Sequence, residues 1–449
     1  MAPPTAPGAL PLLGHALPLL RSPLPFLASL PALGDLVRIR LGPQHVYVAC
    51  TPELTRRVLL EDSTFDKGGL LFDRARETLG NGLGTCPHRD HRRQRQLIQP
   101  AFHPERLPRY GQVMTEQITA VTRSWQQGQV IDVLADMQQI TARTLVATML
   151  ADARLTGVAL TEMIDDLHTF QAAFYRRMFM PPPLDRLPTP GNRRYVRAGI
   201  RLRASLSRII AEYRAAGTDH GDLLSALLAA RDSHSGDATG QGMSDGELTD
   251  QIITFSFAGT ETTAALLAWA LHLVARHPGV EEALHREADG VLAGAAATVG
   301  DLPRLEVTGR ILTETLRLYP PGYLLTRTTT RPTELGGHLL PAGATVAYSP
   351  YVIHHRPDLY PDPERFDPDR WKDGGTARTP RGTLVPFAAG PRKCIGDTFA
   401  ITEATLALAT IATRWRLEPV SGTPVRPALG STLTPQGLHM LATPRRQGP

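Results

Sequence analysis

The chain has 449 residues, of which 42% are hydrophobic and 20% charged, so it can bury a large core and is neither disordered nor fibrous. Its formal net charge of +5 is scattered, with no basic run interleaved with aromatic residues, which argues against a nucleic-acid partner. Only three cysteines are present and no Cys-x-x-Cys pair, which excludes a disulfide framework and favours a reducing cytoplasm.

The first 20 residues, MAPPTAPGALPLLGHALPLL, are apolar but lack a basic start and contain five prolines. Proline interrupts a helix, so we expect a soluble, unprocessed start and no membrane anchor. The run 37–50 then alternates apolar and polar residues around Gly42-Pro43, which predicts a β-hairpin. A second strand-rich patch lies at 334–349.

Most other segments repeat apolar residues every three or four positions, which is typical of helices. Examples are Pro52–Leu60, Gln112–Trp125, Tyr195–Ala215, Asp222–Ala230 and Thr402–Trp415. The chain is therefore predicted to be mainly α with a minor β portion. Its length allows three domains, but the one polar stretch, 231–247, fits a surface loop better than a linker. We predict a single domain over 1–449.

The segment Ile252–Ala275 is long, apolar on nearly every side and carries one formal charge, Glu261. Several threonines and a histidine argue against a transmembrane span, so we predict a helix through the middle of the core. Gly259 permits close approach of a neighbour. A buried carboxylate is costly unless it is hydrogen-bonded or faces a wet cavity. Glu261 is therefore either a tolerated core acid or part of a functional site.

A single cysteine near the carboxyl end precedes another helical pattern, in the order Phe387, Gly390, Arg392, Cys394, Gly396. A thiol at a helix start meets unpaired N–H groups that favour the thiolate, the form that binds a metal. Taken alone, the commoner fate of such a cysteine is inert burial. Gly390 would allow a sharp turn, and Gly396 would leave room for a flat ligand against the backbone. The spacing of the five residues favours a metal ligand.

This spacing resembles the haem-ligating loop of the cytochrome P450 family, and it matches every fixed position. Further stretches of the chain resemble other family motifs in the required order. They are His91–Arg95, Ala258–Thr263, Glu314-Thr-Leu-Arg317 and Pro363–Phe366. His91 stands where the family usually has tryptophan. The resemblance covers about residues 88–403.

The resemblance implies the family's fold, with a long central helix over haem b and the cysteine loop beneath it. Cys394 would ligate the iron, Glu261 would relay protons and Thr262 would hydrogen-bond dioxygen. Two further groups of residues follow from the family motifs and their positions. The haem propionates would contact His91, Arg95, Arg327 and Arg392, and structural ion pairs would join Glu314, Arg317 and Arg365.

The segments that form the substrate pocket in this family are apolar here, which suits a hydrocarbon-like substrate held by shape. The alternative for each residue is ordinary core packing. The residues are Leu70, Leu71, Phe72, Phe170, Phe174, Phe179, Ile253, Phe257, Ala258, Tyr323, Leu324, Leu325 and Leu433. Stretches such as HRRQRQLIQPAFHPERLPRYG also resemble terpene-oxidising actinobacterial members. That implies stepwise oxidation of an allylic methyl of a tricyclic sesquiterpene, in antibiotic biosynthesis.

The chain has no flavin, nicotinamide or iron–sulfur fingerprint, so electrons must come from another protein. The resemblance implies a ferredoxin and a ferredoxin reductase, fed by NAD(P)H, and the use of O2. We expect an acidic ferredoxin to dock near Arg92, Arg93 and Lys393. A haem-thiolate peroxygenase, a monooxygenase for another lipophilic substrate and a haem sensor remain as alternatives.

Overall fold

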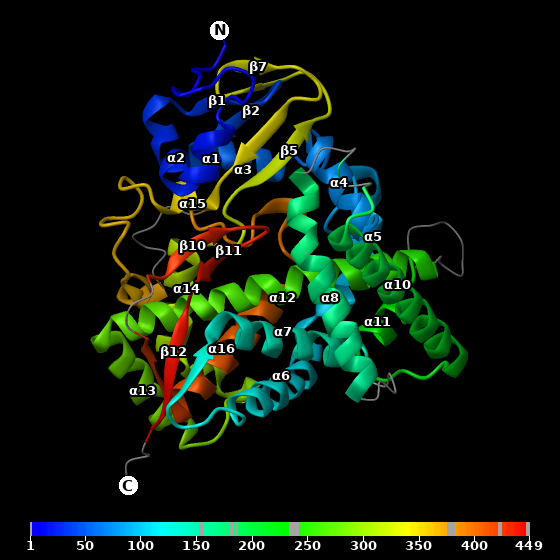
Figure 1. Cartoon of the computed structure of the whole chain (residues 1–449), viewed down its shortest axis with the longest axis vertical. Coiled ribbons are helices and arrows are strands. Elements are labelled where there is room, and N and C mark those ends of the chain that lie inside the picture. Colours follow the sequence, from blue (N-terminus) through cyan, green and yellow to red (C-terminus); the bar gives the residue numbers. More distant parts are fainter. Residues whose placement is uncertain are drawn as a thin grey trace.

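The computed structural model describes residues 2–151, 157–179, 184, 187–232, 242–374, 382–420 and 424–445. Helices dominate these residues, as predicted (Figure 1). The α-helices are α1 Ala16–Arg21, α2 Pro23–Ser29, α3 Pro52–Leu60, α4 Gly69–Leu79, α5 His88–Ile98, α6 Leu107–Thr122, α7 Val133–Met149, α8 Gly157–Phe179, α10 Pro190–Ala216, α11 Leu223–Ala229, α12 Asp245–Arg276, α13 Pro278–Leu292, α14 Glu306–Leu318, α15 Pro350–His354 and α16 Asp397–Arg414.

The minor β portion includes a five-stranded sheet near the amino terminus, in the order β1-β2-β8-β5-β3. Its strands are β1 Leu36–Leu41, β2 Gln44–Ala49, β3 Phe65–Asp66, β5 Leu325–Thr329 and β8 Thr345–Tyr348. The predicted hairpin is confirmed: Leu41 pairs with Gln44, and Gly42 supplies the left-handed turn with φ +58°. The patch at 334–349 also contains the small hairpin of β6 Thr333–Leu335 and β7 His338–Leu340.

Two further sheets fall outside the predicted β regions. One has the order β4-β12-β9, and the other is the hairpin β10-β11. The strands are β4 Gln129–Asp132, β9 Trp415–Pro419, β10 Arg426–Leu429, β11 Leu433–Gln436 and β12 His439–Pro444. Trp415 therefore begins a strand and does not end the last helix. Four of these five strands have only four or five residues, which is too few for their alternation to be distinguished from loop sequence.

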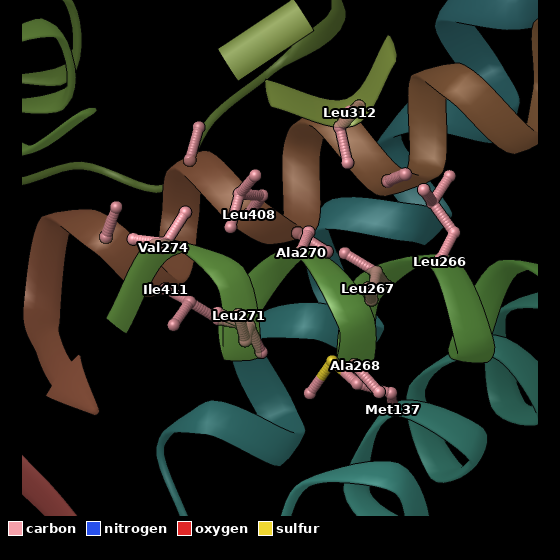
Figure 2. Close-up of a cluster of buried hydrophobic side chains, with 14 of the residues drawn as sticks. Met137, Leu266, Leu267, Ala268, Ala270, Leu271, Val274, Leu312, Leu408 and Ile411 are labelled. Carbon is pink, nitrogen blue, oxygen red and sulfur yellow. The ribbon is translucent and has the colours of Figure 1, made fainter. Parts of the chain in front are cut away.

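Helix α12 crosses the middle of the molecule, as expected for the apolar central segment (Figure 1). It begins at a capping box in which Ser244 and Glu247 satisfy each other's backbone N–H groups. Its carboxyl half packs Leu267 and Leu271 among side chains of α7, α14 and α16 (Figure 2). No helix among the described residues is long and apolar enough to cross a membrane.

The predicted surface loop 231–247 is described only in part. Residues 233–241 lie outside the described residues, and α12 already begins at Asp245. At the amino terminus, the proline-rich segment forms two short helices, α1 and α2, and Pro23 occupies the first turn of α2. Proline therefore limits helix length there, as expected.

Candidate functional site

The cysteine loop makes a tight turn before α16. Gly390 has φ +71°, and a Cβ at this position would lie 2.6 Å from the backbone oxygen of Leu59. The Cys394 N–H donates to the Phe387 carbonyl at 2.9 Å, which closes the loop. The predicted role of Gly390 in a sharp turn is thereby explained, because a side chain would clash with the backbone of α3.

The thiol of Cys394 is accessible to solvent on one side. Burial on the other side raises the pKa of the Cys394 thiol, although a hydrogen bond from the Gly396 backbone opposes this. The net direction is opposite to that expected from the helix start alone, because desolvation disfavours the charged form. Since a metal ion deprotonates a coordinating thiol, ligation would supply the thiolate.

Two cations, the half-buried Lys67 and the buried Arg327, lie close to each other near the cysteine loop. Lys67, directly after β3, donates to the Gly84 carbonyl at 2.7 Å. Arg327, on β5, donates to the Thr326 carbonyl at 2.8 Å and to the Tyr348 hydroxyl at 3.3 Å. Burial, followed by repulsion from Arg327 and Arg392, lowers the pKa of Lys67 to about 7. Neither Lys67 nor Arg327 has a carboxylate partner among the described ion pairs of the chain.

His91, Arg95 and Arg392, the other residues predicted to contact the propionates, lie close enough to one another to interact electrostatically. His91 on α5 is buried, and burial together with Arg392, Lys67 and Arg95 lowers its pKa to about 3, so its imidazole is neutral near pH 7. Arg95 donates to the Lys393 carbonyl of the cysteine loop. This cluster has more positive than negative charge, and it lies next to the thiol.

Arg392 differs from the other cations because the chain supplies its partners. Its guanidinium donates to Asp66 Oδ1 and to the Cys86 carbonyl, both at 2.8 Å, and lies 3.4 Å from Asp62 Oδ2. The predicted contact of Arg392 with a propionate therefore stays a prediction, and two protein carboxylates already balance its charge. Sequence reasoning missed Lys67, although it is one of only three lysines in the chain.

The predicted acid–alcohol pair lies in the middle of α12. Thr262 Oγ1 donates to the Ala258 carbonyl at 2.6 Å. Burial raises the pKa of Glu261, and a hydrogen bond from Ser431 opposes this. The helix is continuous through this segment. The neighbour that approaches Gly259 is Leu145 of α7, because an added Cβ would lie 3.3 Å from its methyl carbon.

One aromatic ring connects the cysteine loop with α12. Phe102, at the end of the short 3-10 helix Gln99–Phe102, lies 3.8 Å from the position of a Cβ on Gly396. Its ring packs edge-on against Phe255 of α12, with centroids 5.4 Å apart. No other described atom lies closer to that Cβ position, so packing within the described part of the chain does not require glycine there. The prediction that a flat ligand lies against Gly396 is compatible with this space.

The E-x-x-R pair forms a buried ion pair on α14. Arg317 donates to both carboxylate oxygens of Glu314, at 2.9 and 2.7 Å, and both side chains are fully buried. The expectation for Arg365 is corrected, because this residue is exposed and only its carbonyl accepts from Arg317, at 3.1 Å. The second cation beside Glu314 is Arg370, at 3.5 Å.

The predicted pocket residues divide by burial. Phe170 and Phe174 of α8 are buried and pack edge-on against Phe257, with ring centroids 5.6 and 5.2 Å apart. Three further pocket candidates are also buried: Ile253, Tyr323 and Leu433. Ordinary core packing, the alternative given in the sequence analysis, is sufficient to explain their positions. The residues with accessible surface are Phe72, Phe257, Ala258, Leu324 and Leu325. The side chains of Leu70, Leu71 and Phe179 lie outside the described part of the chain.

Comparisons with known proteins give the family and the fold of the chain. The family model described as Cytochrome P450 matches residues 3–443. The chain is 48% identical over 446 residues to "Cyclooctat-9-en-7-ol 5-monooxygenase" of Streptomyces melanosporofaciens, covering 98% of this chain and 95% of that protein. It is 46% identical over 446 residues to "Pentalenene oxygenase" of Streptomyces avermitilis, covering 99% and 98%. The crystal structure of the cytochrome P450DA heme domain matches with a TM-score of 0.89 at 26% identity, covering 100% and 99%.

The chain belongs to the cytochrome P450 family. It is a cytochrome P450 monooxygenase, which uses haem, O2 and electrons from redox partners. The residues present fit the cofactor: haem carries two carboxylates, and the half-buried Lys67 and the buried Arg327 are two cations without a carboxylate partner among the described residues. Cys394 offers the only accessible thiol among the described cysteines.

Proposed function

We propose that the enzyme oxidises a C–H bond of a cyclic terpene, and that pentalenene is its first candidate substrate. Stepwise oxidation of one allylic methyl would give the alcohol and then the aldehyde. The observation that carries this proposal is the similarity, over nearly the whole chain, to relatives named for pentalenene and cyclooctat-9-en-7-ol. The apolar accessible residues Phe72, Phe257 and Leu324 support it, because they offer shape without a fixed charge.

Haem, when bound, would supply dioxygen activation, and a thiolate ligand to its iron would favour O–O cleavage. Cys394 would hold the iron, and Lys67 and Arg327 would hold the propionates. The Thr262 hydroxyl donates its hydrogen bond to the Ala258 carbonyl, so the lone pairs of Oγ1 can accept another hydrogen bond. Glu261, whose pKa is raised by burial, retains a proton to higher pH than an exposed glutamate and suits proton delivery.

A substrate panel tests the proposal. The purified holoenzyme is titrated with pentalenene, with cyclooctat-9-en-7-ol and with a linear fatty acid, and the spin state of the haem is followed by absorbance. We expect pentalenene to shift the spin state and to yield the alcohol and aldehyde on turnover. The 48% identity to the cyclooctat-9-en-7-ol enzyme makes that alcohol the second candidate. A response only to the fatty acid would refute the assignment to terpenes.

We propose that the electron donor is a small acidic ferredoxin, reduced by a ferredoxin reductase. The predicted docking residues need revision, since Arg93 pairs with Glu247 at 2.6 Å and Lys393 with Asp397 at 2.5 Å. Arg92 is exposed and has no ion pair among the described side chains. Turnover with ferredoxin should fall as salt rises, and more steeply than in Arg92→Ala. The single domain over 1–449 and the cytoplasmic location stay predictions.

A further inference from the structure

The turn between β10 and β11 reaches the acid of α12. Leu429 and Leu433 are paired, and the turn consists of Gly430, Ser431 and Thr432. Ser431 Oγ donates to Glu261 Oε2 at 2.5 Å, across 170 positions in the sequence. Among the described residues, the Ser431 hydroxyl is the group that donates a hydrogen bond to the Glu261 carboxyl group.

The turn has a fixed position relative to α12. Trp269 Nε1, two helical turns beyond Glu261, donates to the Leu433 carbonyl at 3.0 Å. On the other side, the Leu433 N–H donates to the Pro321 carbonyl at 3.1 Å. Figure 1 shows the β10-β11 hairpin beside α12. Because the hairpin is bonded on both sides, Ser431 meets Glu261 in a defined geometry.

In the described part of the chain, no charged side chain acts on the Glu261 carboxyl group. The pKa of Glu261 is governed by burial, which raises it, and by the Ser431 hydroxyl, which lowers it; no described cation or second carboxylate acts on it. The nearest residues on its own helix, Thr260 and Thr262, direct their hydroxyl groups to the carbonyls of Ser256 and Ala258. A neutral hydroxyl therefore orients the carboxyl group, and it can be released without breaking an ion pair.

We propose that Ser431 is a positioning residue that orients the Glu261 carboxyl group for proton delivery toward Thr262. The proposal rests on the proposed roles of Glu261 and Thr262. The proton that Glu261 gives up is replaced by one from water, so Ser431 itself is neither consumed nor changed. Its hydrogen bond holds Oε2 of Glu261 and thereby fixes the orientation of the other carboxyl oxygen.

The hydrogen bond can be tested without turnover. Infrared spectroscopy follows the carboxyl C=O band of Glu261, which is assigned by its absence in Glu261→Gln, through a pH titration. In Ser431→Ala the midpoint should move to higher pH, because a donor to the charged form is lost. Ser431→Thr retains a hydroxyl and should restore the wild-type midpoint. An unchanged midpoint in Ser431→Ala would overturn the proposal.

Coupling provides the second readout. In Ser431→Ala, product formed per electron pair consumed should fall about tenfold, the effect of one hydrogen bond to a charged group. In the Glu261→Gln background the same substitution should cause no further loss. An equal loss in both backgrounds would overturn the positioning role while leaving the proposed function intact. If the single variant Glu261→Gln forms as much product per electron pair as the wild type, the proton-delivery role is refuted, and this inference with it.

Discussion

Replacement of Arg317 by methionine should destabilise the enzyme severely. Arg317 makes five hydrogen bonds: two to Glu314, two to the carbonyls of His354 and Pro363, at 3.1 and 2.6 Å, and one to the carbonyl of Arg365. The substitution leaves a fully buried carboxylate without its main partner. Removing one member of a buried ion pair costs about 3–5 kcal/mol, which is a large part of a typical stability of about 5–15 kcal/mol.

The assay is urea denaturation of the holoenzyme, followed by far-ultraviolet circular dichroism. The matched control is Arg89→Met, because Arg89 is 84% exposed and lies 3.5 Å from Asp90. That exposed pair should contribute only about 0–1 kcal/mol to the free energy of unfolding. Adding Glu314→Leu to Arg317→Met should recover part of the loss, because the unpaired buried carboxylate is then removed. A loss below about 1 kcal/mol for Arg317→Met alone would refute the reasoning.

Three more outcomes are expected. Thr262→Ala should lower product per electron pair consumed and raise hydrogen peroxide; tight coupling would argue against its role in proton delivery. Lys67→Met should speed haem transfer to apomyoglobin about tenfold, through loss of a charge-assisted hydrogen bond, whereas the exposed control Lys372→Met should not. Burial raises the pKa of Glu403 from 4.5 to about 8. Between pH 4.5 and 8, Glu403 therefore keeps its proton in the folded state but has released it in the unfolded state. Wild-type stability should therefore fall relative to Glu403→Gln as pH rises from 4.5 to 8; parallel stability curves would contradict this.

Features encoded by neighbouring residues could be predicted from the sequence. Helix α3 has the predicted bounds, because Thr51 caps it by accepting from the Leu54 N–H and Pro52 occupies its first turn. The cysteine loop and the Glu314–Arg317 pair are equally local, since all their side chains lie within one turn or one short loop. A sequence shows both the residue types of such local motifs and the spacing between them, which is why these features could be predicted.

Features that depend on distant segments could not be predicted. Arg365 and Arg370 are both near the E-x-x-R helix, and only packing decides that Arg370 faces Glu314. Ser431 is a turn residue with no local sign that it contacts Glu261. The pKa of Cys394 depends on burial by segments that come together only in the fold, so its direction could not be read from the helix start.

The carbon monoxide difference spectrum of the reduced holoenzyme tests the central claim, that Cys394 ligates the haem iron. Wild-type protein should show the red-shifted Soret band of a thiolate-ligated haem, and Cys394→Ser should lose that band while still binding haem. The buried Cys86→Ser variant should keep it. A red-shifted band that persists in Cys394→Ser would contradict the account.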